Sequence, residues 1–159
     1  MPVIIDGYNL LWFIRESDEQ FDSVTDAQLC QILGRYFRLT GKRGEIVFDG
    51  TGPRDKNIFK SITNLEISFS GLGTEADTII ERKITASTAP KRLIVVSTDR
   101  RLRDAARARK ATAVKSELFW KKVQKQLARK RKTLEPAAKR HGLSETEADQ
   151  WIKFFDLKQ

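Results

Sequence analysis

Short apolar runs alternate with helically patterned segments along most of the chain, and this alternation constrains the fold more than any other feature. Four runs rich in Val, Ile and Phe are bounded by turn residues, as buried strands are. They cover residues 3–5, 45–48, 65–69 and 93–97, and a weaker fifth run covers 111–114. Apolar residues at helical spacing occupy the intervals 24–39, 75–86, 101–108 and 118–134. Strands that alternate with helices predict an α/β fold with a mainly parallel sheet.

The length and the cysteine count narrow the class of protein. A chain of 159 residues can bury a hydrophobic core without disulfides. Cys30 is the only cysteine, so it can form neither an internal disulfide nor a cysteine-based zinc site. No apolar run is long enough to span a bilayer, and the first residues lack a signal-peptide pattern. We therefore expect a cytoplasmic protein with no membrane partner.

The net charge of +9 is concentrated in one part of the chain. Residues 1–99 carry a net charge of −2, residues 100–132 carry +12 and residues 133–159 carry −1. A charge that only kept the protein in solution would be spread out, whereas a basic patch for a polyanion is concentrated. We expect a polyanionic partner, and a solvated basic face is the alternative explanation.

Carboxylates follow the predicted strands. Asp6 ends the first run, Asp49 follows the second, Asp99 follows the fourth, and the loop after the third brings Asp77 to the start of a helix. The carboxyl ends of the strands in an open parallel sheet form a crevice that binds ligands, so four carboxylates would converge there. Their mutual repulsion calls for a cation, and the scarcity of His and Cys favours Mg²⁺ or Mn²⁺ over zinc. Asn9, one turn beyond Asp6, could orient a carboxylate, a water or a phosphate.

Each of these acids also has a purely structural explanation. An Asp beside a strand end can cap a helix or form a turn. Asp77 and Asp99 precede helical patterns, and Asp49 precedes a glycine. Capping does not explain why all four acids fall on one edge of the predicted sheet, so a metal site is the preferred interpretation.

Four motifs together resemble the NYN domains of the PIN-like nuclease superfamily, most closely the YacP-like branch. They are VIIDGYNLL at 3–11, IVFDG at 46–50, TEADTIIERKI at 74–84 and LIVVSTDRRLRDAARA at 93–108. The resemblance extends over about residues 3–120 and implies a three-layer α/β/α PIN-like fold. On this basis we divide the chain into an NYN/PIN-like nuclease domain, residues 1–135, and a C-terminal helical extension, residues 136–159.

The resemblance implies a Mg²⁺- or Mn²⁺-dependent endoribonuclease that hydrolyses RNA phosphodiester bonds. Asp6, Asp77 and Asp99 would hold the metal, and Asp49 and Asn9 would orient water or substrate beside them. Glu81 and Asp104 are weaker candidates for supporting roles, and pairing of Glu81 with a neighbouring arginine is its preferred explanation. Some YacP-like proteins are described as cutting messenger RNA on the ribosome, which makes the ribosome a candidate partner.

Basic residues of the segments RRLRDAARARK and KKVQKQLARKRK are the candidates for contacts with the RNA backbone. They are Arg100, Arg101, Arg103, Arg107, Lys121, Lys122, Arg129, Lys130, Arg131 and Lys132. Trp12, Phe13 and Trp120 could stack on bases, but packing in the core is the preferred interpretation for most of them.

The last segment, GLSETEADQWIKFFDL, contains a capping box formed by Ser144 and Glu147 and predicts a final helix. Trp151, Ile152 and Phe155 would share one face of this helix. The helix would either pack on the domain, which we prefer, or serve as an exposed docking helix. The lone histidine, His141, is expected at the surface.

Two other functions compete with the nuclease. The first is a catalytically silent module that binds RNA or the ribosome through the same fold and basic helices. The second is a phosphohydrolase, but the Asp-x-Asp nucleophile motif of haloacid-dehalogenase-like enzymes is missing where the chain reads Asp6, Gly7, Tyr8. The chain also contains neither G-x-G-x-x-G nor G-x-x-x-x-G-K-[ST], so we expect no nucleotide cofactor.

Overall fold

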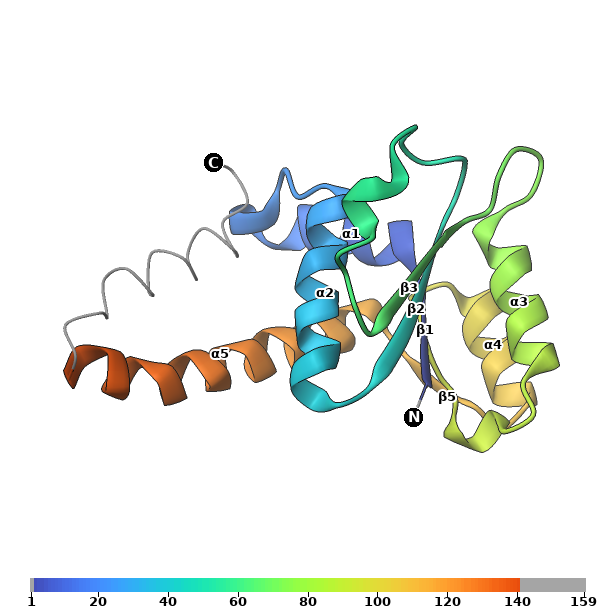
Figure 1. The fold of residues 1–159 in the computed structure, drawn as a ribbon. Helices are drawn as coiled ribbons and strands as arrows, with labels where there is room; N and C mark the ends of the chain where they lie inside the picture. Colours follow the sequence, from blue (N-terminus) through green and yellow to red (C-terminus); the bar gives the residue numbers. More distant parts are fainter. Residues whose placement is uncertain (1, 141–159) are drawn as a thin grey trace.

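Five parallel strands form one central sheet in the computed structural model, which describes the backbone of residues 2–140 and the side chains of residues 2–129 (Figure 1). The strands are β1 (Pro2–Asp6), β2 (Arg43–Phe48), β3 (Leu65–Phe69), β4 (Ile94–Val96) and β5 (Thr112–Val114). Their order across the sheet is β3-β2-β1-β4-β5. All five predicted strands are present, and the prediction of a mainly parallel α/β sheet is confirmed.

Five helices cover the two faces of the sheet. They are α1 (Gly7–Ser17), α2 (Asp26–Thr40), α3 (Ala76–Ala86), α4 (Arg100–Ala108) and α5 (Ser116–Arg140). Three short 3₁₀ helices lie in the connections, at η1 (Glu19–Phe21), η2 (Lys56–Phe59) and η3 (Pro90–Arg92). Figure 1 shows α1, α2 and α5 on one side of the sheet and α3 and α4 on the other, which makes three layers.

The neighbouring strands β1 and β4 are largely apolar because both of their faces are buried. Ile5 faces the core formed with α1, α2 and α5, whereas its neighbour Ile4 faces the smaller core formed with α3 and α4. Successive side chains of a strand point to opposite faces, so a continuous apolar run is what a two-sided sheet requires. The prediction of an α/β/α fold is confirmed.

The helices α2, α3 and α4 begin and end close to the predicted bounds, whereas α5 continues past its predicted end at residue 134 to Arg140, and α1 was missed. This helix follows β1 without an intervening turn, and Asp6 occupies its N-cap position without a side-chain capping bond. The sequence therefore lacks the usual signal for a helix start. Gly7 permits the close approach of α1 to β2, because a Cβ there would lie 2.4 Å from the Phe48 ring.

The chain changes direction across the sheet between β1 and β4. The chain leaves β1 through α1 and α2 on one face, whereas β4 continues into α4 on the other face. Such a point, where neighbouring strands lead to helices on opposite faces, opens a crevice at the carboxyl ends of the strands. The fold therefore places the ends of β1 and β4, with their acids, at the usual ligand-binding position of an open α/β sheet.

Candidate active site

Asp6 is the most buried acid of the site. Its side chain lies at the end of β1, the residue is 6 % exposed, and its Oδ2 accepts a hydrogen bond of 3.1 Å from the Ser97 hydroxyl. Its pKa is raised to about 7, mainly by burial and then by the charges of Asp77 and Asp49, while the hydrogen bond from Ser97 opposes the shift. The carboxylate is therefore held where its negative charge is unfavourable.

The carboxyl groups of Asp77 and Asp99 lie close together. Asp77 lies in the first turn of α3, and its pKa is raised to about 6 by burial, by a side-chain hydrogen bond with Asp99 and by the charges of Asp99 and Asp49. Two carboxyls that share a hydrogen bond must hold a proton between them or recruit a cation. Asp6, Asp49, Asp77 and Asp99 therefore form one electrostatically coupled group, which we call the acidic edge.

Asp49 also has a structural role that its sequence position does not reveal. Its Oδ1 accepts a hydrogen bond of 2.6 Å from the backbone N–H of Ala76. Ala76 is the first residue of α3, so a carboxylate that follows β2 satisfies an N–H group at the start of a helix far along the chain. This bond fixes the end of α3 that carries Asp77.

Asp99 both caps a helix and belongs to the acidic edge. Its Oδ1 accepts a hydrogen bond of 2.9 Å from the Arg101 N–H and caps α4, while its backbone N–H donates to the Ser97 hydroxyl at 3.0 Å. Capping occupies one carboxylate oxygen, and the same side chain pairs with Asp77. The two explanations weighed for this residue are therefore compatible.

Asn9 joins three segments of the chain. Its Oδ1 accepts a hydrogen bond of 2.8 Å from the Thr98 N–H and one of 2.6 Å from the Ser116 hydroxyl. These bonds connect α1 to the loop after β4 and to the start of α5. The side-chain oxygen thus holds the loop that carries Asp99, which is compatible with the first of the three roles considered for Asn9, the orientation of a carboxylate.

Two serines complete the site and were not among the predicted site residues. Ser97 and Ser116 are fully buried, and each hydroxyl contacts a predicted site residue. The sequence signal for Ser97 is its place at the end of a strand within Ser-Thr-Asp. Ser116 has no such signal, because a serine at the start of a helix usually acts as a cap.

The donor chemistry of the acidic edge fits a hard divalent cation, but the side chains are not arranged as a preformed metal site. Among the described residues, no three His, Cys, Asp or Glu side chains are grouped so that they could hold one ion. Single oxygens of Asp6, Asp49 and Asp99 are already engaged by protein donors. The pKa values of Asp6 and Asp77 are raised because burial and the neighbouring carboxylates outweigh the favourable interactions of both groups, and a bound cation would offset this repulsion.

Arg100, Arg101 and Arg107 of α4 form ion pairs with nearby acids. Arg101 pairs with Glu81 of α3, as expected for Glu81, and also lies close enough to Asp77 for their charges to interact. Arg100 and Arg107 flank Asp104 at 3.8 and 3.7 Å on the exposed surface of α4. Asp104 is therefore part of a surface charge network, and Arg103 is half-buried beside it.

The basic residues of α5 project into solvent along the helix. Lys121, Lys122, Lys125 and Arg129 are exposed, while Phe119, Trp120, Val123 and Leu127 pack in the core. The side chains of Lys130, Arg131 and Lys132 lie outside the described residues, as do His141 and the predicted final helix. Trp120 and Phe13 pack against the core as expected, but Trp12 is 53 % exposed.

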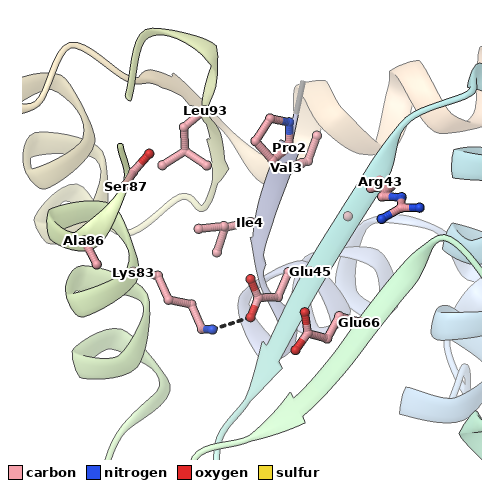
Figure 2. Close-up of a pocket in the computed structure, with 11 residues that line it drawn as sticks. Pro2, Val3, Ile4, Arg43, Glu45, Glu66, Lys83, Ala86, Ser87 and Leu93 are labelled. Atoms are coloured by element: carbon pink, nitrogen blue, oxygen red, sulfur yellow. Dashed lines mark ion pairs between the residues drawn. The ribbon is translucent and has the colours of Figure 1, made fainter. Parts of the chain in front are cut away.

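A hollow of about 390 Å³ lies at the opposite end of the sheet and is separate from the acidic edge (Figure 2). Pro2, Val3 and Ile4 of β1 line it, and the ion pair of Lys83 with Glu45 lies beside it. Pro2 begins the strand that Asp6 ends. This cavity therefore contributes nothing to the chemistry of the carboxylates.

Within the described part of the chain, no helix combines the length and the apolar character needed to cross a membrane.

Comparison with known structures supports the fold. The crystal structure of Rae1 (YacP) from Bacillus subtilis superposes with a TM-score of 0.69 at 20 % sequence identity, covering 97 % of this chain and 94 % of that one. Its W164L mutant gives a TM-score of 0.61 at 19 % identity, covering 84 % and 82 %. A search of curated proteins found no match.

A comparison with models of protein families identifies the family of the chain. The model of the YacP-like NYN domain matches residues 3–156, which extends well past the limit near residue 120 that the motifs suggested. NYN domains are nuclease-like, so the match indicates an RNA-related function of nuclease type. The division of the chain at residue 135 stays a prediction, and α5 runs through that position. The chain belongs to the YacP-like NYN domain family.

Proposed function

We propose that this protein is a Mg²⁺- or Mn²⁺-dependent endoribonuclease that hydrolyses RNA at the acidic edge. The observation that carries the proposal is the coupling of four carboxylates, with the pKa of Asp6 raised to about 7 and that of Asp77 to about 6. A fold that needed these acids only as caps would have no reason to bury Asp6, which occupies the N-cap position of α1 without a side-chain capping bond. Perturbed carboxyl groups in a strand-end crevice are typical of functional sites.

In this proposal Asp6, Asp77 and Asp99 hold the cation, which would lower the pKa of a water and stabilise the charge that develops on the phosphate. Asp49 keeps Asp77 in place through the start of α3. Asn9 and Ser97 position the loop that carries Asp99. The exposed lysines of α5 attract the RNA backbone by their charge.

The experiment that tests the proposal combines cleavage with cation binding. Purified protein is incubated with a labelled single-stranded RNA in Mn²⁺, in Mg²⁺ and in EDTA, beside the Asp77→Asn variant. We expect internal cleavage with either metal, none in EDTA and a loss of at least about a hundredfold in the variant. Calorimetric titration with Mn²⁺ should show weaker binding to Asp77→Asn, whose unchanged size preserves the fold.

The form of the RNA substrate is a separate part of the proposal. We propose messenger RNA on the ribosome as the specific substrate, following the implication of the family resemblance. The test compares cleavage of one transcript free in solution with cleavage of the same transcript bound to translating ribosomes. Equal rates would remove the ribosome from the proposal and leave the nuclease intact.

A catalytically silent RNA- or ribosome-binding module is the second candidate. The observation that favours it is that no three acidic side chains of the described residues are grouped around one possible ion position. Tight RNA binding together with no cleavage in any metal, and no heat of Mn²⁺ binding, would establish this alternative.

A further inference from the structure

We propose that Tyr8 and Trp12 form a platform on α1 on which bases of single-stranded RNA stack beside the acidic edge. The inference rests on the proposed function for the identity of the nucleic acid. It adds a surface that binds bases to an active site whose other proposed contacts are made by charged side chains.

Trp12 is exposed although it belongs to an apolar helix. The residue is 53 % exposed, whereas its neighbours Leu10, Leu11 and Ile14 are buried. The other large exposed hydrophobic residues of the described chain, Ile58, Leu72 and Leu118, are aliphatic. An indole ring offers a flat surface on which any base can stack, and aliphatic side chains do not.

The ring of Trp12 is held in a defined position. The guanidinium carbon of Arg15 lies 5.1 Å from its centroid, and the Arg15 Nε donates a hydrogen bond of 2.8 Å to the Val24 carbonyl. The Tyr8 ring lies 6.4 Å from Trp12, with an angle of 32° between the planes. A side chain already braced in this way loses little conformational entropy when a base stacks on it.

Tyr8 connects the platform to the acidic edge. Its ring packs edge-on against Phe48 at 5.1 Å, and Phe48 directly precedes Asp49. Tyr8 also follows Asp6 by two residues, in the first turn of the helix that begins where β1 ends. Tyr8 therefore lies next to the carboxylates, and Trp12 lies one helical turn, about 6 Å, farther along α1.

This arrangement specifies the class of nucleic acid. A phosphate at the carboxylates would leave the neighbouring bases to pass along α1 over Tyr8 and Trp12, with Arg15 beyond them as a cation. Stacking on side chains requires unpaired bases, because the bases of a duplex are already stacked on each other. The platform therefore fits single-stranded RNA and excludes a continuous duplex.

The test measures RNA binding without cleavage. In EDTA, fluorescence anisotropy gives the Kd of wild type, Trp12→Leu and Trp12→Phe for a single-stranded RNA and for an abasic RNA of the same length. We expect Trp12→Leu to weaken binding of the RNA with bases about 5- to 100-fold and binding of the abasic RNA little. Trp12→Phe keeps a flat ring and should lose less. Quenching of tryptophan fluorescence by the RNA with bases should be greater in wild type than in Trp12→Phe.

The outcomes separate this inference from the proposed function. Equal affinities of wild type and Trp12→Leu for the RNA with bases, while wild type still cleaves RNA in Mn²⁺, would overturn the platform alone. An equal loss on abasic RNA would likewise overturn it. Absence of cleavage with the Trp12 effect intact would overturn the nuclease alone. Melting temperatures of the variants near that of wild type exclude unfolding as the cause.

Discussion

The buried carboxyl group of Asp6 makes the stability of the folded protein depend on pH. The folded protein retains the Asp6 proton up to about pH 7, whereas the unfolded chain releases it near its ordinary pKa of 3.8. Between these values the folded state binds more protons than the unfolded state, so the free energy of unfolding falls as the pH rises from about 4 to about 7. The acid weakens the metal-free fold at neutral pH.

Replacing Asp6 by asparagine should therefore stabilise the metal-free protein. Each unit of pKa shift corresponds to about 1.4 kcal/mol of unfolding free energy, which is about 3 °C in the Tm of a domain of this size. Because the Asp6 pKa is shifted by more than one unit, Asp6→Asn in EDTA at pH 8 should raise the Tm by about 3 °C or more. The gain should shrink toward pH 4, where wild-type Asp6 is neutral. Scanning calorimetry across this pH range measures the effect, with Asp104→Asn on the exposed surface as the control. A constant Tm difference at all pH values would contradict the electrostatic cause.

We expect the replacement of Asn9 to lower the stability of the folded protein. Asn9→Ala leaves the buried Ser116 hydroxyl and the Thr98 N–H without their common acceptor, which should cost about 1–3 kcal/mol. Ser116→Ala should cost less, because the Thr98 bond survives. Urea denaturation of both variants measures the difference. If both unfold at the wild-type midpoint, the connection among α1, α5 and the Asp99 loop contributes nothing to stability.

At the level of elements, α3 and α4 meet through the Glu81–Arg101 pair next to the acidic edge. Glu81→Gln removes a negative charge from the path of the RNA and frees Arg101. The Tm should hardly change, because Arg101 is exposed to solvent and such pairs contribute little. RNA affinity in EDTA should rise severalfold at low salt, and the rise should vanish at high salt. Unchanged affinity at low salt would place Arg101 off the RNA path.

The helix α5 should contribute the salt dependence of RNA binding. Changing Lys121, Lys122 and Lys125 together to Gln should lower the slope of log K against log salt by about 0.7 for each lost contact with single-stranded RNA. The matched control changes Arg43, Lys91 and Arg92 to Gln at the amino ends of the strands, with the same loss of charge. Equal slopes for the two triple variants would show that α5 is only a solvated basic face.

At the scale of the whole molecule, the sequence predicted the arrangement of the sheet better than the contacts within the site. Strand ends are visible in a sequence, and all strands of a parallel sheet end at the same edge, so the gathering of Asp6, Asp49 and Asp99 there could be inferred without knowing the strand order. The bond from Asp49 to the start of α3 could not, because it joins segments whose relative position depends on packing. Whether three carboxylates surround one point depends on side-chain rotamers, which periodicity does not encode.

Which of the three aromatic residues Trp12, Phe13 and Trp120 stays exposed could not be predicted from the sequence, for a similar physical reason. Helical residues with large apolar side chains are usually buried, so core packing was the preferred interpretation. The run LLWFI in α1 presents more apolar surface than one side of a sheet can cover, and Trp12 is the member that stays outside. Sequence patterns show how much apolar surface a helix has but not which part of it remains uncovered.

The separation of the four acids along the chain, from residue 6 to residue 99, has a consequence for biosynthesis. A growing polypeptide that contains only β1 to β3 holds Asp6 and Asp49 but neither partner from α3 and α4. Asn9 gains its second donor only when Ser116 has been made. The proposed activity therefore cannot arise in a nascent chain that has not yet reached Asp99, so the ribosome that makes this protein is not exposed to an active nuclease while the first three strands are being synthesised.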